Sequence, residues 1–139
     1  MSPRKFDKDK LSDIDLYLGE PNEQVRESMR AMMREQGYRR TRTFSRLDDL
    51  LNAVKEAPPD ILIAADDLDP RMFDVIRDIR HFKIGRNPFI LITLMVKAEN
   101  DDIVKKAILA GADDVMIKPV APGKLLERVA FMTMNRSPF

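Results

Sequence analysis

The sequence predicts an α/β domain in which helices cover both faces of a parallel five-stranded sheet. Five short strand-like segments, most of them apolar, alternate with five segments whose apolar residues recur at helical spacing. Two of the apolar segments, ILIAA (61–65) and FILITL (89–94), carry no charge, which is typical of the buried centre of a parallel sheet. A chain of 139 residues fits one such domain of ordinary size.

The other three strands are predicted at 14–18, 38–44 and 114–117. The segment YRRTRTF (38–44) alternates with period two, so this strand has one basic side that faces solvent. Right-handed crossover helices between parallel strands then give a (βα)5 architecture.

Capping residues delimit the helices between these strands. Asn22 and Ser45 are expected to be the N-caps of the first two helices, and Gly37 ends the first. Asn100 or Asp101 is expected to open the fourth helix.

The composition excludes several classes of protein. The chain has no Cys, so it forms no disulfide or thiolate metal site, and His81 alone cannot form a zinc site. A net charge of +1 favours neither direct nucleic-acid binding nor a membrane surface, and no apolar run is long enough to span a bilayer. We therefore expect a cytoplasmic protein whose residues 1–11 form a flexible tail and not a signal peptide.

Functional side chains are predicted at the carboxyl edge of the sheet, where parallel α/β proteins place their chemistry. Glu20 follows the first strand, Asp66 and Asp67 follow the third, Thr93 lies late in the fourth, and Lys118 follows the fifth. A carboxylate can accept a phosphoryl group when a divalent cation offsets charge and a lysine pairs with the phosphoryl oxygens. A hydroxyl can then sense the product.

With these motifs the chain resembles the response-regulator receiver family over residues 12–132. The resemblance rests on GEPNEQVRESMRAMMREQGY, PPDILIAADDLDP, NPFILITL and AGADDVMIKPVAPGKLLERV. It implies a flavodoxin-like fold with strand order 2-1-3-4-5, a tail at 133–139, and a cis peptide at Lys118–Pro119.

The resemblance also implies roles for the residues at the strand ends. Asp66 would be the phosphoacceptor, with Asp67 as second choice, and Lys118 would pair with the phosphoryl group. Thr93 would be the sensing hydroxyl. Mg²⁺ would be the cofactor, held by Glu20 and Asp66.

The first acidic position departs from the pattern of the family, which has two adjacent acids after the first strand. In LGEPN only Glu20 is acidic, and Pro21 or Gly19 stands where the other acid belongs. Asn22 could supply an oxygen unless it caps the helix. One lost carboxylate weakens a site for a hard cation.

The position of the phosphoacceptor also departs from the pattern of the family, because two ways of counting give different residues. Counting from the Pro-Asp before the third strand places the acceptor at Ala65, whereas counting back from Pro70 places it at Asp66. A one-residue strand extension or bulge would reconcile the counts. The loop after Thr93 is longer than usual, and Val115 replaces the switch aromatic of many members.

Two functions follow from the resemblance. The first is a stand-alone bacterial receiver of a two-component system or phosphorelay. It takes a phosphoryl group from a histidine kinase or phosphotransfer protein and signals to a downstream protein partner or as a homodimer. Its enzymatic activity would be at most its own aspartyl phosphorylation and dephosphorylation. The alternative is a phosphorylation-independent pseudo-receiver that acts as a protein-docking adaptor, without Mg²⁺ dependence.

Other interpretations of the same residues stay open. The strand-end acids could be solvated loop residues, and a flavin or nucleotide binder would need a Gly/Ser/Thr-rich loop where GEPNE is acidic. Arg39, Arg40, Arg42 and Arg46 form a basic patch, which we interpret as edge-strand protection before anion binding.

Overall fold

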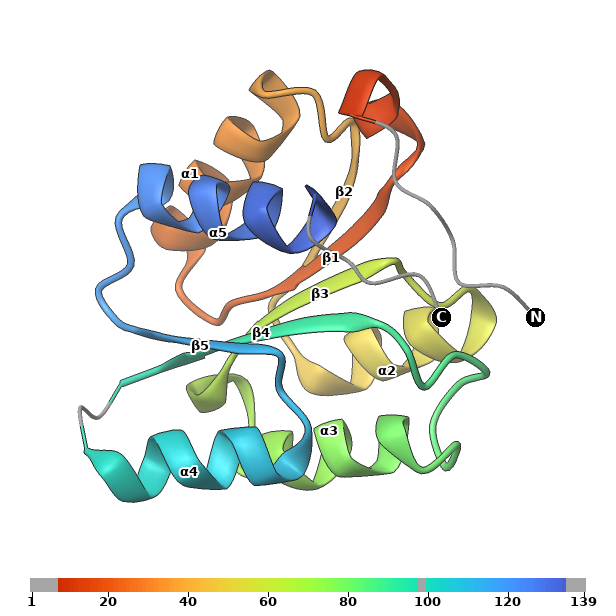
Figure 1. Cartoon of the computed structure of the whole chain (residues 1–139), viewed down its shortest axis with the longest axis vertical. Helices are drawn as coiled ribbons and strands as arrows, with labels where there is room; N and C mark the ends of the chain where they lie inside the picture. Colours follow the sequence, from red (N-terminus) through yellow and green to blue (C-terminus); the bar gives the residue numbers. More distant parts are fainter. Residues whose placement is uncertain (1–7, 98–99, 135–139) are drawn as a thin grey trace.

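Five parallel strands form one sheet in the order β2-β1-β3-β4-β5, in the computed structural model shown in Figure 1. The structure describes residues 8–97 and 100–134. The strands are β1 (Asp15–Gly19), β2 (Arg40–Phe44), β3 (Ile61–Ala65), β4 (Leu91–Val96) and β5 (Asp114–Ile117). The helices are α1 (Glu23–Glu35), α2 (Leu47–Glu56), α3 (Met72–Arg80), α4 (Asp101–Ala110) and α5 (Pro122–Met134). The strand order and the alternation of strands with helices confirm the predicted flavodoxin-like fold.

The sheet separates two hydrophobic cores. Helices α1 and α5 cover one face and α2, α3 and α4 the other (Figure 1). Alternate residues of β3 enter the two cores, with Ile61, Ile63 and Ala65 on the α1/α5 side and Leu62 and Ala64 on the other. All five are fully buried, so β3 is the centre of the sheet in the sense that its apolar sequence predicts.

The predicted bounds are confirmed for β3 and β5, whereas β4 is displaced along the chain. The prediction placed β4 at 89–94, but the strand runs over Leu91–Val96. Met95 and Val96 are fully buried, while Phe89 is exposed. The apolar run is longer than one strand, and its second part forms β4 because those residues are buried. The loop after β4 therefore starts later than predicted, at Lys97.

Two of the predicted N-caps are confirmed. The side chains of Asn22 and Asn100 each accept a hydrogen bond from the main-chain N–H three residues on, at 3.0 and 2.8 Å. Ser45 is not a cap, because α2 begins after Arg46, which makes no side-chain cap bond. Two carboxylates in the first turn of α2 complement the helix dipole instead.

A short 3-10 helix, η1 (Lys8–Asp13), precedes β1 and begins inside the segment predicted as a tail. Leu11 packs against the core on the α1/α5 side. The rest of that segment and most of the predicted tail at 133–139 lie outside the described residues. Within the described ranges, no helix has the length and apolar character needed to cross a membrane.

The guanidinium group of Arg80 fixes the loop between α3 and β4. It donates to the carbonyl oxygens of Gly111, Pro88 and Ile90, at 2.9, 2.7 and 2.7 Å. It also pairs with the carboxylate of Asp113 at 2.9 Å. One side chain thus satisfies three main-chain acceptors at the edge of the sheet where β4 begins.

The end of α3 is closed by a Schellman motif with Phe82 in the left-handed position. The N–H of Phe82 donates to the carbonyl of Ile79 at 3.3 Å, and the N–H of Lys83 donates to that of Asp78 at 2.8 Å. Phe82 has a φ of 61°, where glycine is usual and a residue with a Cβ costs about 1–2 kcal/mol. Its side chain is 66% exposed, so burial within the chain does not offset this cost.

Replacing Arg80 by lysine is expected to lower the free energy of unfolding by about 2–4 kcal/mol, because one ammonium group cannot satisfy the carbonyls that the guanidinium fork reaches. Urea unfolding measures the loss. Arg77→Lys is the control, since the Arg77 side chain is 51% exposed and pairs with Asp74 in the preceding turn of α3, so the loss there should stay below about 0.5 kcal/mol. Equal losses in the two variants would contradict the role given to Arg80.

Candidate functional site

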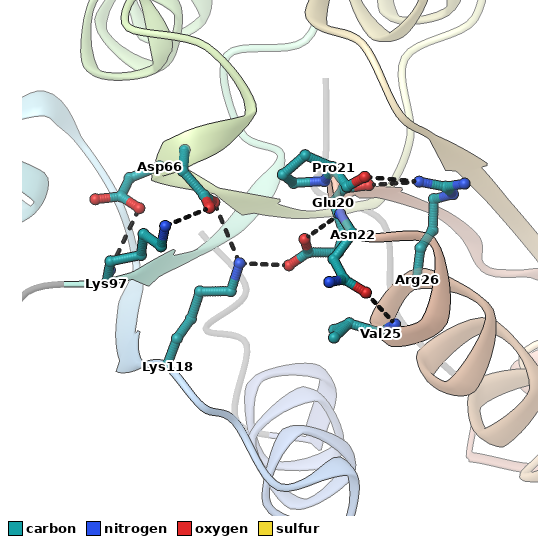
Figure 2. A network of polar contacts seen from close by, with 9 residues as sticks. Glu20, Pro21, Asn22, Val25, Arg26, Asp66, Lys97 and Lys118 are labelled. Atoms are coloured by element: carbon teal, nitrogen blue, oxygen red, sulfur yellow. Dashed lines mark hydrogen bonds and ion pairs between the residues drawn. The ribbon is translucent and has the colours of Figure 1, made fainter.

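Charged side chains from four strand ends meet at the carboxyl edge of the sheet (Figure 2). The group, called the strand-end cluster below, consists of Glu20, Asp66, Asp67, Lys97 and Lys118. Four of these residues were predicted from the sequence, and Lys97 was not.

Glu20 is the buried member of the strand-end cluster, with no exposed surface. One carboxylate oxygen lies 2.6 Å from the Nζ of Lys118. The other accepts a hydrogen bond from the main-chain N–H of Asn22 at 2.8 Å. The carbonyl of Glu20 accepts a further bond from the guanidinium group of Arg26 at 2.9 Å. Both the main chain and the carboxylate of Glu20 are therefore fixed.

Lys118 bridges Glu20 and Asp67. Its ammonium group lies 3.1 Å from the carboxylate of Asp67 as well as 2.6 Å from that of Glu20, and its side chain is 16% exposed. Burial alone would lower the pKa of Lys118, but the two carboxylates outweigh burial and raise that pKa above its ordinary value. Lys118 thus stays charged across the neutral range. The peptide bond between Lys118 and Pro119 is cis, as predicted.

Lys97 is a member of the site that the sequence analysis missed. Its Nζ lies 3.6 Å from the carboxylate of Asp67, and its main-chain N–H donates to the carboxylate of Asp66 at 3.3 Å. Lys97 follows the last residue of β4, so the early end predicted for that strand hid it. The available signal was a lysine directly after an uninterrupted apolar run.

Asp66 carries a perturbed carboxyl group. Burial raises the pKa of Asp66 above its ordinary value, and the nearby charge of Asp67 acts in the same direction. The hydrogen bond from Lys97 and the charge of Lys118 lower that pKa and offset only part of the rise. The ammonium group of Lys118 contacts Glu20 and Asp67, so the lysine predicted to serve the acceptor lies against the second-choice acceptor.

Ala65 is the last residue of β3 and is fully buried. It continues the regular parallel register, opposite Met95 of β4, and the 3-10 turn η2 (Asp66–Leu68) begins at the next residue. The extension or bulge that would have moved Asp66 into the strand is therefore absent from β3. The methyl group of Ala65 cannot accept a phosphoryl group.

Thr93 is not brought into the strand-end cluster. It lies in the middle of β4, level with Ile63 of β3, and is fully buried. Its hydroxyl donates to the sulfur of Met132 on α5 at 3.6 Å. Because β4 ends at Val96, the position directly beyond the strand belongs to Lys97 and not to a hydroxyl residue.

The residues at this edge do not fit a Mg²⁺ site. Glu20 and Asp67 are both occupied by Lys118, and the side-chain oxygen of Asn22 is used as a helix cap. A Cβ at Gly19 would lie 2.7 Å from the Leu68 side chain, so that position is closed to a second acid unless Leu68 moves. Within the described parts of the chain, no three acidic, histidine or cysteine side chains are grouped to hold a metal ion.

Comparison with known proteins gives a consistent result. The family model described as "Response regulator receiver domain" matches residues 19–130. The transcriptional regulatory protein AfsQ1 of Streptomyces coelicolor is 36% identical over 115 residues, which cover 81% of this chain and 47% of that protein. The chain thus spans about half the length of this curated relative.

Solved structures share the fold at low identity. An orphan response regulator of H. pylori has a TM-score of 0.77 at 15% identity, covering 88% of this chain and 98% of the other. The chemotaxis protein CheY4 of Vibrio cholerae has a TM-score of 0.75 at 16% identity, covering 85% and 97%.

Lys118→Met is expected to reduce the free energy of unfolding by about 3–5 kcal/mol, because it leaves the buried carboxylate of Glu20 without a counter-charge. The double variant Glu20→Gln/Lys118→Met should recover most of that loss, since no isolated charge remains. Chemical unfolding measures both. Lys124→Met, at an exposed position of α5, is the control and should change little. A loss in Lys118→Met no larger than in the control would show that the pair contributes nothing.

Asp66→Asn is expected to be more stable than the wild type at neutral pH, and this gain should disappear in acid. Because the folded pKa of Asp66 is raised, the folded state binds the proton more tightly than the unfolded chain does. The wild type therefore loses stability as the pH rises from about 4 through the folded pKa, and the amide does not.

Urea unfolding of both proteins at about pH 3 and about pH 7 measures this difference. Asp49→Asn, which removes an exposed carboxylate of α2, is the control and should show no such gain. A difference between wild type and Asp66→Asn that is the same at both pH values would contradict the raised pKa.

Proposed function

This chain belongs to the response-regulator receiver family, and we propose that it works without phosphorylation, as a receiver that docks other proteins. Receiver domains generally act with histidine kinases or phosphotransfer proteins, and they use Mg²⁺ when they are phosphorylated. In this function the receiver fold is unchanged, and the chain signals by binding another protein and not by accepting a phosphoryl group.

The ammonium group of Lys118 between Glu20 and Asp67 carries this proposal. Aspartyl phosphorylation needs carboxylates free to bind a cation and a lysine free to meet the phosphoryl oxygens. Here the lysine lies 2.6 and 3.1 Å from two of the three carboxylates. The charges that the reaction requires are already paired with each other.

Lys97 supports the same proposal. Its ammonium group lies 3.6 Å from the Asp67 oxygen that Lys118 does not contact, and its main-chain N–H donates to Asp66. Two lysines thus face three carboxylates in the strand-end cluster. A divalent cation near Lys97 would meet a positive charge as well as carboxylates that already have partners.

We propose a protein as the target of docking. The net charge of +1 gives no general attraction to nucleic acid. The curated relative is named a transcriptional regulatory protein, and a receiver that docks a regulatory partner fits that setting. A homodimer is a special case of the same function.

Phosphoryl acceptance is the second candidate, favoured by the 3.1 Å contact between Lys118 and Asp67. In this candidate Asp67 replaces Asp66 as the first choice of acceptor, because the lysine that would pair with the phosphoryl oxygens lies against Asp67. The donor would be a histidine kinase or phosphotransfer protein, and the chain would catalyse its own modification.

Incubation with a small-molecule phosphodonor and Mg²⁺ is expected to leave the intact mass of the protein unchanged. Asp66→Asn and Asp67→Asn are measured beside the wild type, with a phosphorylatable receiver as positive control. A Mg²⁺-dependent phosphoryl adduct that is lost in one of the two variants would establish the second candidate and identify the acceptor. In parallel, added Mg²⁺ should not raise the Tm, because a ligand that binds the folded state stabilises it.

A further inference from the structure

The loop between α3 and β4, residues 81–90, presents exposed aromatic side chains. Phe82 is 66% exposed and Phe89 is 60% exposed. Phe82 belongs to neither core cluster, although it holds a left-handed conformation that disfavours any residue except glycine. A phenylalanine at this position raises the free energy of the folded chain relative to glycine, and its ring makes little contact within the chain. Such residues are typical of binding sites.

This loop is held in one conformation. The Arg80 guanidinium group binds the carbonyls of Pro88 and Ile90. Gly85 lies against the Val54 side chain of α2, where a Cβ would be 3.2 Å from that side chain. The aromatic groups are therefore mounted on a fixed backbone, so binding through them loses little conformational entropy.

The loop itself carries basic side chains and no acidic one. The titratable side chains of residues 81–90 are His81, Lys83 and Arg86, and all three are exposed. Of the acids next to the loop, Asp113 is paired with Arg80 at 2.9 Å, and the carboxylate of Asp60 accepts a hydrogen bond from the main-chain N–H of Asp15 at 2.9 Å. Asp78, whose carbonyl accepts from Lys83, is half-buried. The loop combines exposed apolar rings with exposed basic side chains, so its complement is an apolar group beside carboxylates.

We propose that residues 81–90 form a docking surface for a protein segment that carries acidic side chains beside an apolar one. The loop lies where the strands of the sheet begin, at the opposite edge from the strand-end cluster (Figure 1). This surface adds to the proposed docking function and stands whether or not the cluster accepts a phosphoryl group. Phe82 is the anchor of the contact, and Lys83 and Arg86 select its charge.

Selection from a displayed library of random ten-residue peptides tests this directly on the full chain. Enriched peptides are expected to combine Asp or Glu with an apolar residue and to bind more weakly as salt is added. Phe82→Gly should weaken their binding by about tenfold or more, and Lys83→Glu/Arg86→Glu should weaken it as well. The Tm of Phe82→Gly should equal or exceed that of the wild type, so that lost binding is separated from lost folding.

Leu109→Ala is the matched control, because Leu109 is an apolar residue of α4 that is 84% exposed. It should leave peptide binding unchanged. Peptides that bind Phe82→Gly as well as they bind the wild type would overturn the proposal, as would enriched peptides without acidic residues. So would an empty selection in which vesicles of phosphatidylcholine and phosphatidylglycerol bind the wild type but not Phe82→Gly, which would assign the surface to a membrane. Self-association lost in Phe82→Gly, with no peptide selected, would assign it to a second copy of the chain.

Discussion

The ion pair between Glu20 and Lys118 determines which charges at the carboxyl edge of the sheet are available to a ligand. It joins the ends of β1 and β5, which are separated in the sheet by β3 and β4, and one partner has no exposed surface. A buried carboxylate is tolerated only with a counter-charge and further hydrogen bonds, and Glu20 has both through Lys118 and Asn22. The ammonium group of Lys118 is therefore already paired within the folded chain when no ligand is bound.

The pairing of Lys118 with Glu20 determines how the other charges of the strand-end cluster are balanced. Asp67 shares Lys118 with Glu20 and meets Lys97 on its other oxygen, while Asp66 is left with a main-chain hydrogen bond and a raised pKa. An ammonium group is a single charge on a flexible stem, whereas Mg²⁺ demands several oxygens in a near-ideal octahedron. Lysines can therefore balance carboxylates in a geometry that would not hold the metal.

The fold could be predicted from the sequence because its apolar segments are bounded by charge or turn residues. The segment ILIAA lies between Asp60 and Asp66, so only one placement of β3 buries it. The run FILITLMV lies between Pro88 and Lys97 but is longer than β4, so its boundaries allow more than one placement. The prediction ended β4 too early, assigned Thr93 to the site and missed Lys97. Nor does the sequence signal a left-handed Phe82, since glycine is the usual marker of that conformation.

The two edges of the sheet differ in whether their unfavourable features are compensated inside the chain. Burying the carboxylate of Glu20 costs free energy, but the ion pair with Lys118 and the hydrogen bond from Asn22 offset that cost. The buried charge at the carboxyl edge is therefore balanced within the chain. The left-handed Phe82 has no matching gain, because its ring faces solvent and its neighbours Lys83 and Arg86 are exposed. A sequence that breaks a local rule without an internal gain points to an external one. We therefore expect a partner at the edge where the strands begin, although receiver chemistry belongs to the edge where they end.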